Sequence, residues 1–107
     1  MNERRGKYNA IKTEVDGIKF HSRKEAVRYQ ELKFLEMAGE IGYLKLQPAY
    51  PCIVNGVKIC DYYADFEYIT TADTMTHTED VKGYKTDVYK LKKKLVEAIY
   101  KIKIEEV

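Results

Sequence analysis

Apolar and polar residues alternate along much of the chain, and two departures from this alternation predict helices. The first helix is expected over 22–38, because Ser22 and Glu25 fit a capping box and Gly39 follows its end. Its apolar residues are spread widely round the helix, so we expect burial on more than one side. The second helix begins after Thr86 and pairs an apolar stripe with a lysine-rich face. The stripe expected in the core is Val88, Leu91, Leu95, Ala98 and Ile99, and the far side carries Lys90, Lys93, Lys94 and Lys101.

The alternating segments around the helices predict strands. The turn pairs Asp16-Gly17 and Asn55-Gly56 predict two hairpins, over 13–20 and 52–59. The second arm of the later hairpin continues without a break through 62–69, and further strands are expected over 43–47, 76–82 and 102–104. The order α-β-β-β-α-β predicts one α/β (α+β) domain over 1–107, with a central mixed sheet flanked by two helices.

Composition excludes several classes of protein. The chain has 107 residues, of which 45% are hydrophobic and 34% are charged, a mixture too apolar for a disordered protein. It contains no apolar run long enough for a transmembrane helix. The N-terminus is basic, but no apolar segment of a secretory signal follows it. We therefore expect a cytoplasmic protein without a membrane partner, and a flexible basic arm over 1–11.

Charge is distributed unevenly although the net charge is only +2. Residues 61–80 carry six acidic side chains and no Lys or Arg, whereas residues 82–103 carry eight lysines. An acidic centre between basic flanks suits a metal site beside a surface that binds a polyanion. The alternative is a solvated surface on which the charges cancel in space.

The two cysteines do not indicate a disulfide framework. If Val54 pairs with Val57 across the Asn-Gly turn, Cys52 and Cys60 are one residue out of register and point to opposite faces. We expect two reduced thiols with a structural role. A zinc site would need ligands gathered from distant parts of the chain, since His21 and His77 are isolated in sequence.

The residues that indicate chemistry lie near the ends of two predicted strands. Alternation puts Asp80 and Lys82 on one strand face, and a hairpin would set Asp65 beside Asp80. Adjacent carboxylates repel unless a cation lies between them, and Mg²⁺ prefers carboxylate, water and phosphate oxygens. A nearby lysine can hold the attacking water or offset phosphate charge. The three residues therefore predict a site for phosphodiester hydrolysis.

The same residues, with Glu25 in the first helix, resemble the PD-(D/E)xK nuclease superfamily. The similarity is closest to small phage and prophage proteins of uncharacterised function within it, and it covers nearly the whole chain. It is carried by the segments 13–18, 22–26, 29–32, 46–48, 63–66, 79–83 and 85–87. The resemblance implies a restriction-endonuclease-like core. Ala64 stands where the name motif has Pro, and the second acidic residue is Asp80 where Glu is also found.

The resemblance also implies a role for each matching residue. Asp65 and Asp80 would bind the metal, with the carbonyl of Val81 completing its shell. Lys82 would be the catalytic lysine, and Glu25 the helix glutamate of resolvase-like members. Helix capping is a sufficient alternative role for Glu25, and a surface ion pair is the alternative for Asp80 and Lys82. The cofactor expected is Mg²⁺, with Mn²⁺ as a substitute.

The basic residues expected to contact DNA phosphates are Arg4, Arg5, Lys7, Lys85, Lys90, Lys93 and Lys94, although the lysines of the second helix also suit a plain solvated face. The function expected is a Mg²⁺-dependent DNA endonuclease, acting on branched or recombination intermediates in a bacterial cell that hosts a phage or prophage. The alternative is an inactive nucleic-acid-binding or assembly module that keeps the nuclease fold. Because duplex cutting needs two sites or two visits, we also expect a homodimer.

Overall fold

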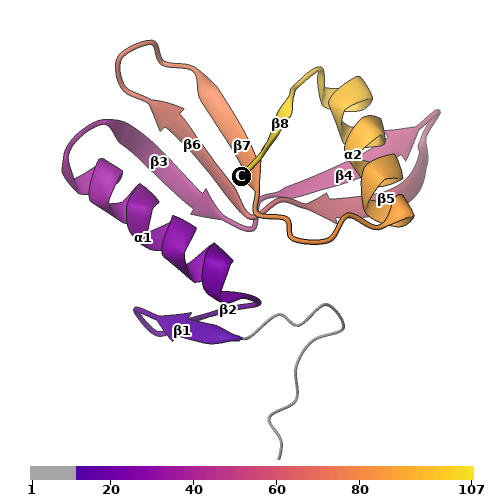
Figure 1. Ribbon diagram of the computed structural model, residues 1–107. Coiled ribbons are helices and arrows are strands. Elements are labelled where there is room, and N and C mark those ends of the chain that lie inside the picture. The colour runs from indigo at the N-terminus through magenta and orange to yellow at the C-terminus, as the bar shows by residue number, and fades with distance from the viewer. Residues whose placement is uncertain (1–11) are drawn as a thin grey trace, which may run out of the picture.

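A computed structural model describes residues 12–107, which form a mixed α+β fold with two helices and eight strands (Figure 1). The basic arm predicted over 1–11, with Arg4, Arg5 and Lys7, lies outside the described residues. In chain order the elements are β1 (Thr13–Val15), β2 (Ile18–Phe20), α1 (Arg23–Met37), β3 (Ile41–Leu46), β4 (Ala49–Val54), β5 (Val57–Tyr63), β6 (Phe66–Thr70), β7 (Thr76–Asp80), α2 (Asp87–Tyr100) and β8 (Ile104–Glu106). The predicted class, a mixed sheet with two helices, is confirmed.

The central sheet has the strand order β3-β6-β7-β8. Its neighbours are antiparallel except for β7 and β8, which are parallel. Parallel neighbours need a crossover connection, and α2 supplies it between β7 and β8. Strands β4 and β5 form a separate two-stranded sheet, which α2 covers, while α1 packs against β3 and the β1–β2 hairpin (Figure 1). The fold therefore has two halves, each with its own helix and its own apolar cluster.

The segment predicted as one strand over 62–69 is divided between the two halves. Strand β5 ends at Tyr63 and β6 begins at Phe66, so the prediction of an unbroken strand was wrong. At the break, the Asp65 N–H donates to the Glu79 carbonyl at 3.0 Å, and the Ala64 N–H donates to the Pro48 carbonyl at 3.2 Å. The chain thus leaves one sheet and enters the other within two residues, and Asp65 lies at this junction.

The predicted register of the two cysteines was also wrong. A β-bulge between Cys52 and Ile53 shifts the pairing of β4 with β5, so that Cys52 lies directly opposite Cys60. A bulge adds one unpaired residue to a strand and moves every later side chain to the other face. Both thiols are free, as expected, and burial raises the pKa of Cys52.

Both helices begin where their capping residues predict. The hydroxyl of Ser22 accepts from the Glu25 N–H at 3.1 Å, and that of Thr86 accepts from the Tyr89 N–H at 3.0 Å. However, α1 is buried on one side only, along Glu25, Ala26, Tyr29 and Leu32, while Val27, Phe34 and Met37 are exposed. Neither helix of the described chain is long and apolar enough to cross a membrane.

Helix α2 is rotated relative to the predicted stripe. Val96 is its fully buried residue, and Tyr89, Leu95 and Ile99 pack beside the same cluster. Val88 and Leu91, expected in the core, are 62% and 69% exposed. Lys93, expected on the far side, lies on the inner side with its ammonium at 3.1 Å from Glu106.

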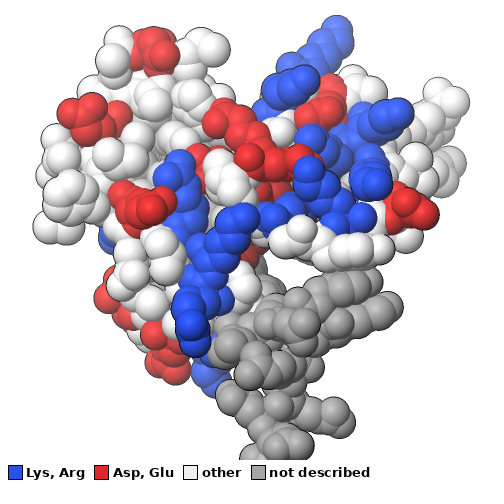
Figure 2. All heavy atoms as spheres, in the orientation of Figure 1, with Lys and Arg blue, Asp and Glu red and all other residues white. Residues whose placement is uncertain are grey.

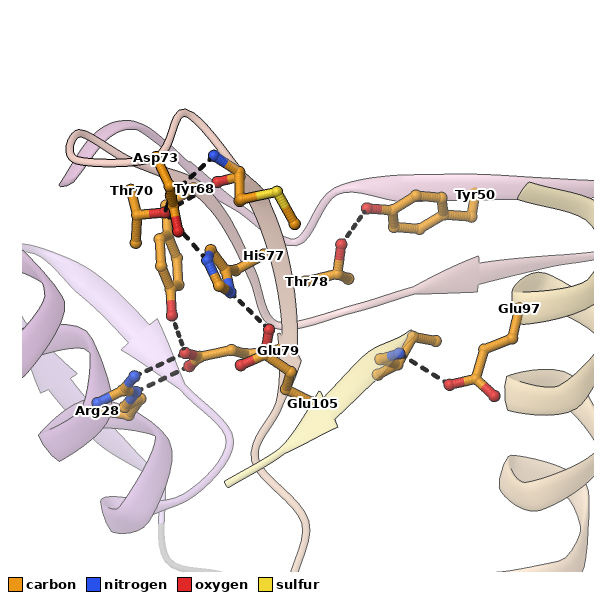
Figure 3. Close-up of polar contacts among 12 residues, drawn as sticks. Arg28, Tyr50, Tyr68, Thr70, Asp73, His77, Thr78, Glu79, Glu97 and Glu105 are labelled. Atoms are coloured by element: carbon orange, nitrogen blue, oxygen red, sulfur yellow. Dashed lines mark hydrogen bonds and ion pairs between the residues drawn. The ribbon is translucent and has the colours of Figure 1, made fainter. Parts of the chain in front are cut away.

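A buried ion pair joins α1 to the middle of the central sheet (Figure 3). Glu79 on β7 is 1% exposed and accepts from Arg28 twice, from Nε at 2.8 Å and from Nη2 at 2.6 Å. The Tyr68 hydroxyl donates to the same carboxylate. Glu79 therefore has a structural role, because its carboxylate joins α1 to the sheet. The two hydrogen bonds from Arg28 and the one from Tyr68 offset the free-energy cost of burying the Glu79 carboxylate.

Removing the cation of this pair should destabilise the fold strongly. In Arg28→Ala, the Glu79 carboxylate stays buried without its charge partner, and we expect a loss of about 3 kcal/mol in the free energy of unfolding. Urea denaturation at neutral pH measures the loss. The control is Lys33→Ala, which breaks the more exposed Lys33–Glu36 pair on the same helix and should leave the midpoint nearly unchanged. Equal losses in the two variants would contradict this account.

Candidate active site

The predicted catalytic residues converge where the two halves of the fold meet. Glu25 comes from the first turn of α1, Asp65 from the break between β5 and β6, and Asp80 from the end of β7 (Figure 1). A cavity of about 400 Å³ opens here, and Glu25, Asp65 and Lys82 line it. The remaining lining residues are His21, Ser22, Lys24, Val81, Gly83 and Tyr84.

Asp65 and Glu25 form a close pair of carboxyl groups. Asp65 Oδ2 accepts from the Val81 N–H at 2.7 Å, and Glu25 Oε1 accepts from the His21 N–H at 2.8 Å. Burial, together with the hydrogen bond to Glu25, raises the pKa of Asp65 to about 7. Burial beside Glu25 therefore favours the protonated form of Asp65. Glu25 serves both the helix cap and this pair, so its two predicted roles are compatible.

Asp80 is the most isolated carboxyl group of the site. Its side chain is fully buried, and neither carboxylate oxygen has a hydrogen-bond partner among residues 12–107. Its ion-pair partner in this part of the chain is Lys82, whose Nζ lies 3.8 Å from Asp80 Oδ1. Burial raises the pKa of Asp80 to about 6 despite the opposing effect of Lys82. Strand β7 ends at Asp80, so Lys82 lies beyond the strand predicted over 76–82, although the two side chains still contact each other.

Lys82 is the charged neighbour that the two aspartates have in common. Its charge lowers the pKa of both Asp65 and Asp80, although burial outweighs it in each case. Its ammonium also lies over the Tyr89 ring, 4.6 Å from the centroid. A second cation, Lys24, donates to the Lys82 carbonyl at 3.4 Å and lines the same cavity. The lining of the cavity thus includes two acidic residues and two lysines.

A second hollow of about 280 Å³ lies on the other side of the Glu25–Asp65 pair. Its walls are mostly apolar and include Phe20 and Phe66, and Gln47 supplies an amide. The Gln47 N–H donates to the Asp65 carbonyl at 2.9 Å. Gln47 has a φ of 52°, a left-handed conformation that non-glycine residues adopt rarely, so the backbone is fixed beside Asp65.

The expected metal site is assembled only in part. Glu25 and Asp65 come together, but the carboxylate of Asp80 lies toward Lys82 and lines neither cavity. Val81 contacts the site through its N–H, which donates to Asp65 Oδ2. Among residues 12–107, no three His, Cys, Asp or Glu side chains gather into a group that could hold a metal ion. Two carboxylates remain as the candidate ligand pair.

The comparisons with known proteins identify a family but no activity. A family described as a protein of unknown function (DUF1064) matches residues 5–106, which is nearly the whole chain. The chain belongs to the DUF1064 family. No curated protein and no solved structure matches it.

The basic residues predicted to contact DNA fall into two groups in this DUF1064 protein. Lys90 and Lys94 are exposed on α2. Lys85 and Lys93 instead form ion pairs with Glu106, at 2.8 and 3.1 Å. Figure 2 shows basic side chains gathered over α2 and the segment before it, continuing toward α1 with acidic side chains among them. Phosphate contacts by Lys85 and Lys93 would therefore compete with Glu106.

Sequence reasoning missed several residues of the site in this DUF1064 protein. Lys24 lies within the capping box, and its position in the box gives no sign that its side chain crosses to the cavity. The Tyr89 ring on α2 lies against the Lys82 ammonium, and Glu106 on β8 accepts a hydrogen bond from the Tyr89 hydroxyl. Neither residue is a close neighbour of Lys82 in the sequence.

Because Asp80 is buried, replacing its carboxyl group with a neutral amide should stabilise the fold at high pH and not at low pH. Its pKa is raised from 3.8 to about 6, so the folded state favours the protonated form, and the cost of burying the charge appears as the pH rises from about 4 past 6. Asp80→Asn should therefore be more stable than the native protein at pH 8, by up to about 3 kcal/mol, and equally stable at pH 4. Urea denaturation in EDTA at both pH values measures this, with Asp61→Asn as a surface control. A difference that does not change with pH would contradict it.

Proposed function

We propose that this protein is a Mg²⁺-dependent DNA endonuclease that hydrolyses phosphodiester bonds at the cavity between its two halves. The observation that carries the proposal is the meeting of Glu25, Asp65 and Lys82 at one cavity, from three separate elements. Asp80, which is buried and has no hydrogen-bond partner in the part of the chain that the structure describes, lies 3.8 Å from the lysine. Buried titratable groups with raised pKa values beside a cavity are typical of functional sites.

The residues present fit a magnesium ion held by two carboxylates. Glu25 and Asp65 lie close enough to share a hydrogen bond, and both line the cavity. Mg²⁺ usually keeps several waters and takes only one or two protein carboxylates together with substrate phosphate oxygens. A bound cation would also offset the neighbouring negative charge that helps to raise the pKa of Asp65. When bound, Mg²⁺ would polarise the phosphodiester and acidify a coordinated water.

The cavity lysines would act on the substrate directly. Lys82 would offset the charge that develops on the phosphate, or orient the attacking water, from its place beside the two aspartates. Lys24 would add a second cation at the same wall. Asp80 would hold the Lys82 ammonium from behind, where no solvent reaches the carboxylate. Asp80 thus has the role of a positioning residue in this proposal.

We propose DNA as the polymer because exposed Lys90 and Lys94 on α2 provide contacts to phosphate that do not depend on sequence. Branched or recombination intermediates are the proposed substrates, in the cytoplasm of a bacterial cell that carries a phage or prophage. Both inferences rest on the resemblance to PD-(D/E)xK nucleases. A homodimer would bring two cavities to the two strands of a duplex, and we propose that state on the same grounds.

The alternative is a nucleic-acid-binding or assembly module without catalytic activity. The observation that favours it is that Asp80 does not line either cavity with Glu25 and Asp65, and that no three possible metal ligands gather within the described chain. Such a module would bind DNA with strong salt dependence and would not cut it.

The test is incubation of the protein with plasmid, duplex and four-way-junction DNA in Mg²⁺ or in EDTA. We expect cleavage that requires the metal. Asp65→Asn should abolish most of it because one of the two metal ligands is lost. Lys82→Ala should lower the rate by roughly 10²–10³ while DNA affinity falls only modestly.

Matched controls come from the Lys58–Asp61 ion pair on the β4–β5 sheet, which does not line the cavity. Asp61→Asn and Lys58→Ala make the same chemical changes there and should cleave at the native rate. Cleavage at the native rate by Asp65→Asn and Lys82→Ala would contradict the proposed site. Salt-sensitive binding without any cleavage by the native protein would support the alternative module.

A further inference from the structure

The Lys82 ammonium is held by an aromatic ring as well as by a carboxylate. Its Nζ lies 4.6 Å from the centroid of the Tyr89 ring and 3.8 Å from Asp80 Oδ1. The lysine side chain is 28% exposed, at the wall of the cavity. Because a lysine has a long flexible stem, a defined position needs contacts on more than one side.

The Tyr89 ring is fixed in turn. Its hydroxyl donates to Glu106 Oε2 at 2.8 Å, and its ring packs 6.4 Å from the Tyr62 ring, centroid to centroid. Its N–H is the one that the Thr86 hydroxyl caps at the start of α2. The ring can therefore neither turn nor withdraw without breaking a cap, a hydrogen bond or a core contact.

Glu106 connects this ring to the rest of the site. The same carboxylate accepts from Lys85 in the loop before α2 and from Lys93 on α2, so three donors hold it. One residue further on, the Val107 N–H donates to the Asp80 carbonyl at 2.9 Å. The chain at the end of β8 thus forms hydrogen bonds to both Asp80 and Tyr89.

We propose that Tyr89 is a positioning residue for Lys82. The face of the Tyr89 ring holds the Lys82 ammonium at the cavity wall. The inference rests on the proposed function, because it assigns a role in the chemistry of the same lysine. The face of an aromatic ring carries negative charge density and attracts an ammonium. The hydrogen bond that the Tyr89 hydroxyl donates to a carboxylate adds to that density, so the ring and Glu106 act together on the cation.

Three variants distinguish the contributions of the Tyr89 ring, of its hydroxyl and of the packing of α2 to the position of Lys82. Tyr89→Leu removes the ring, and Tyr89→Phe keeps the ring but loses the hydrogen bond to Glu106. Tyr100→Leu is the matched control, since it removes an aromatic ring from the same helix, where Tyr100 packs 5.3 Å from Tyr50, with no contact to Lys82. All three are made in the full chain.

The first measurement does not depend on activity. In the NMR spectrum, the ring current of Tyr89 should move the ε-methylene signal of Lys82 upfield in the native protein. The displacement should persist in Tyr89→Phe and Tyr100→Leu and vanish in Tyr89→Leu. A Lys82 signal at its ordinary position in the native protein, or one unchanged in Tyr89→Leu, would overturn the proposal even if Tyr89→Leu folded poorly.

The second measurement is the rate of DNA cleavage. Tyr89→Leu should lower kcat about tenfold with little change in KM, and Tyr89→Phe should recover most of that loss. Adding Tyr89→Leu to Lys82→Ala should cost nothing more, because the ring acts through the lysine. An equal further loss in the double variant would overturn the positioning role. If the native protein cuts no DNA, the proposed function fails, while the NMR result still decides whether the ring holds Lys82.

Discussion

Two adjacent carboxyl groups, both buried at the end of β7, constrain the rest of the structure. Glu79 and Asp80 are 1% and 0% exposed, on opposite faces of the strand. A buried charge is stable only when it is paired or neutralised. Glu79 is fully paired, by Arg28 and Tyr68, and so binds α1 to the sheet. Asp80 has no hydrogen-bond partner within the described residues, and it forms its ion pair with Lys82.

This division gives the two faces of β7 different environments. The paired face gives the fold its helix–sheet contact and leaves no carboxylate oxygen free for a ligand. On the other face the carboxyl group of Asp80 is buried, and burial raises its pKa and that of Asp65 because the negative charge of each is unfavourable there. Lys82 offsets part of that charge but cannot satisfy all of it. We infer that a cation and a phosphate complete the electrostatic balance of the site.

Local signals were sufficient to predict the helix starts at Ser22 and Thr86 and the turn at Asn55-Gly56, because caps and tight turns depend on a few neighbouring residues. The bulge beside Cys52 has no such signal, since it arises from the packing of one strand on another. The rotation of α2 was not predicted for a similar reason. The apolar residues of this helix fit more than one buried face, and the position of the sheet decides that the face with Val96 is buried. The site was predicted as a set of residues, but the orientation of each carboxylate was not.

The central claim is that Glu25 and Asp65 hold a divalent cation beside Lys82. Anomalous X-ray scattering from crystals soaked in Mn²⁺ tests it most directly, because Mn²⁺ substitutes for Mg²⁺ at oxygen ligands and its position is recorded independently of any reaction. The account predicts one anomalous peak between the Glu25 and Asp65 carboxylates, on the cavity side, and its loss in Asp65→Asn crystals. A peak only at exposed surface carboxylates, with none between Glu25 and Asp65, would contradict it.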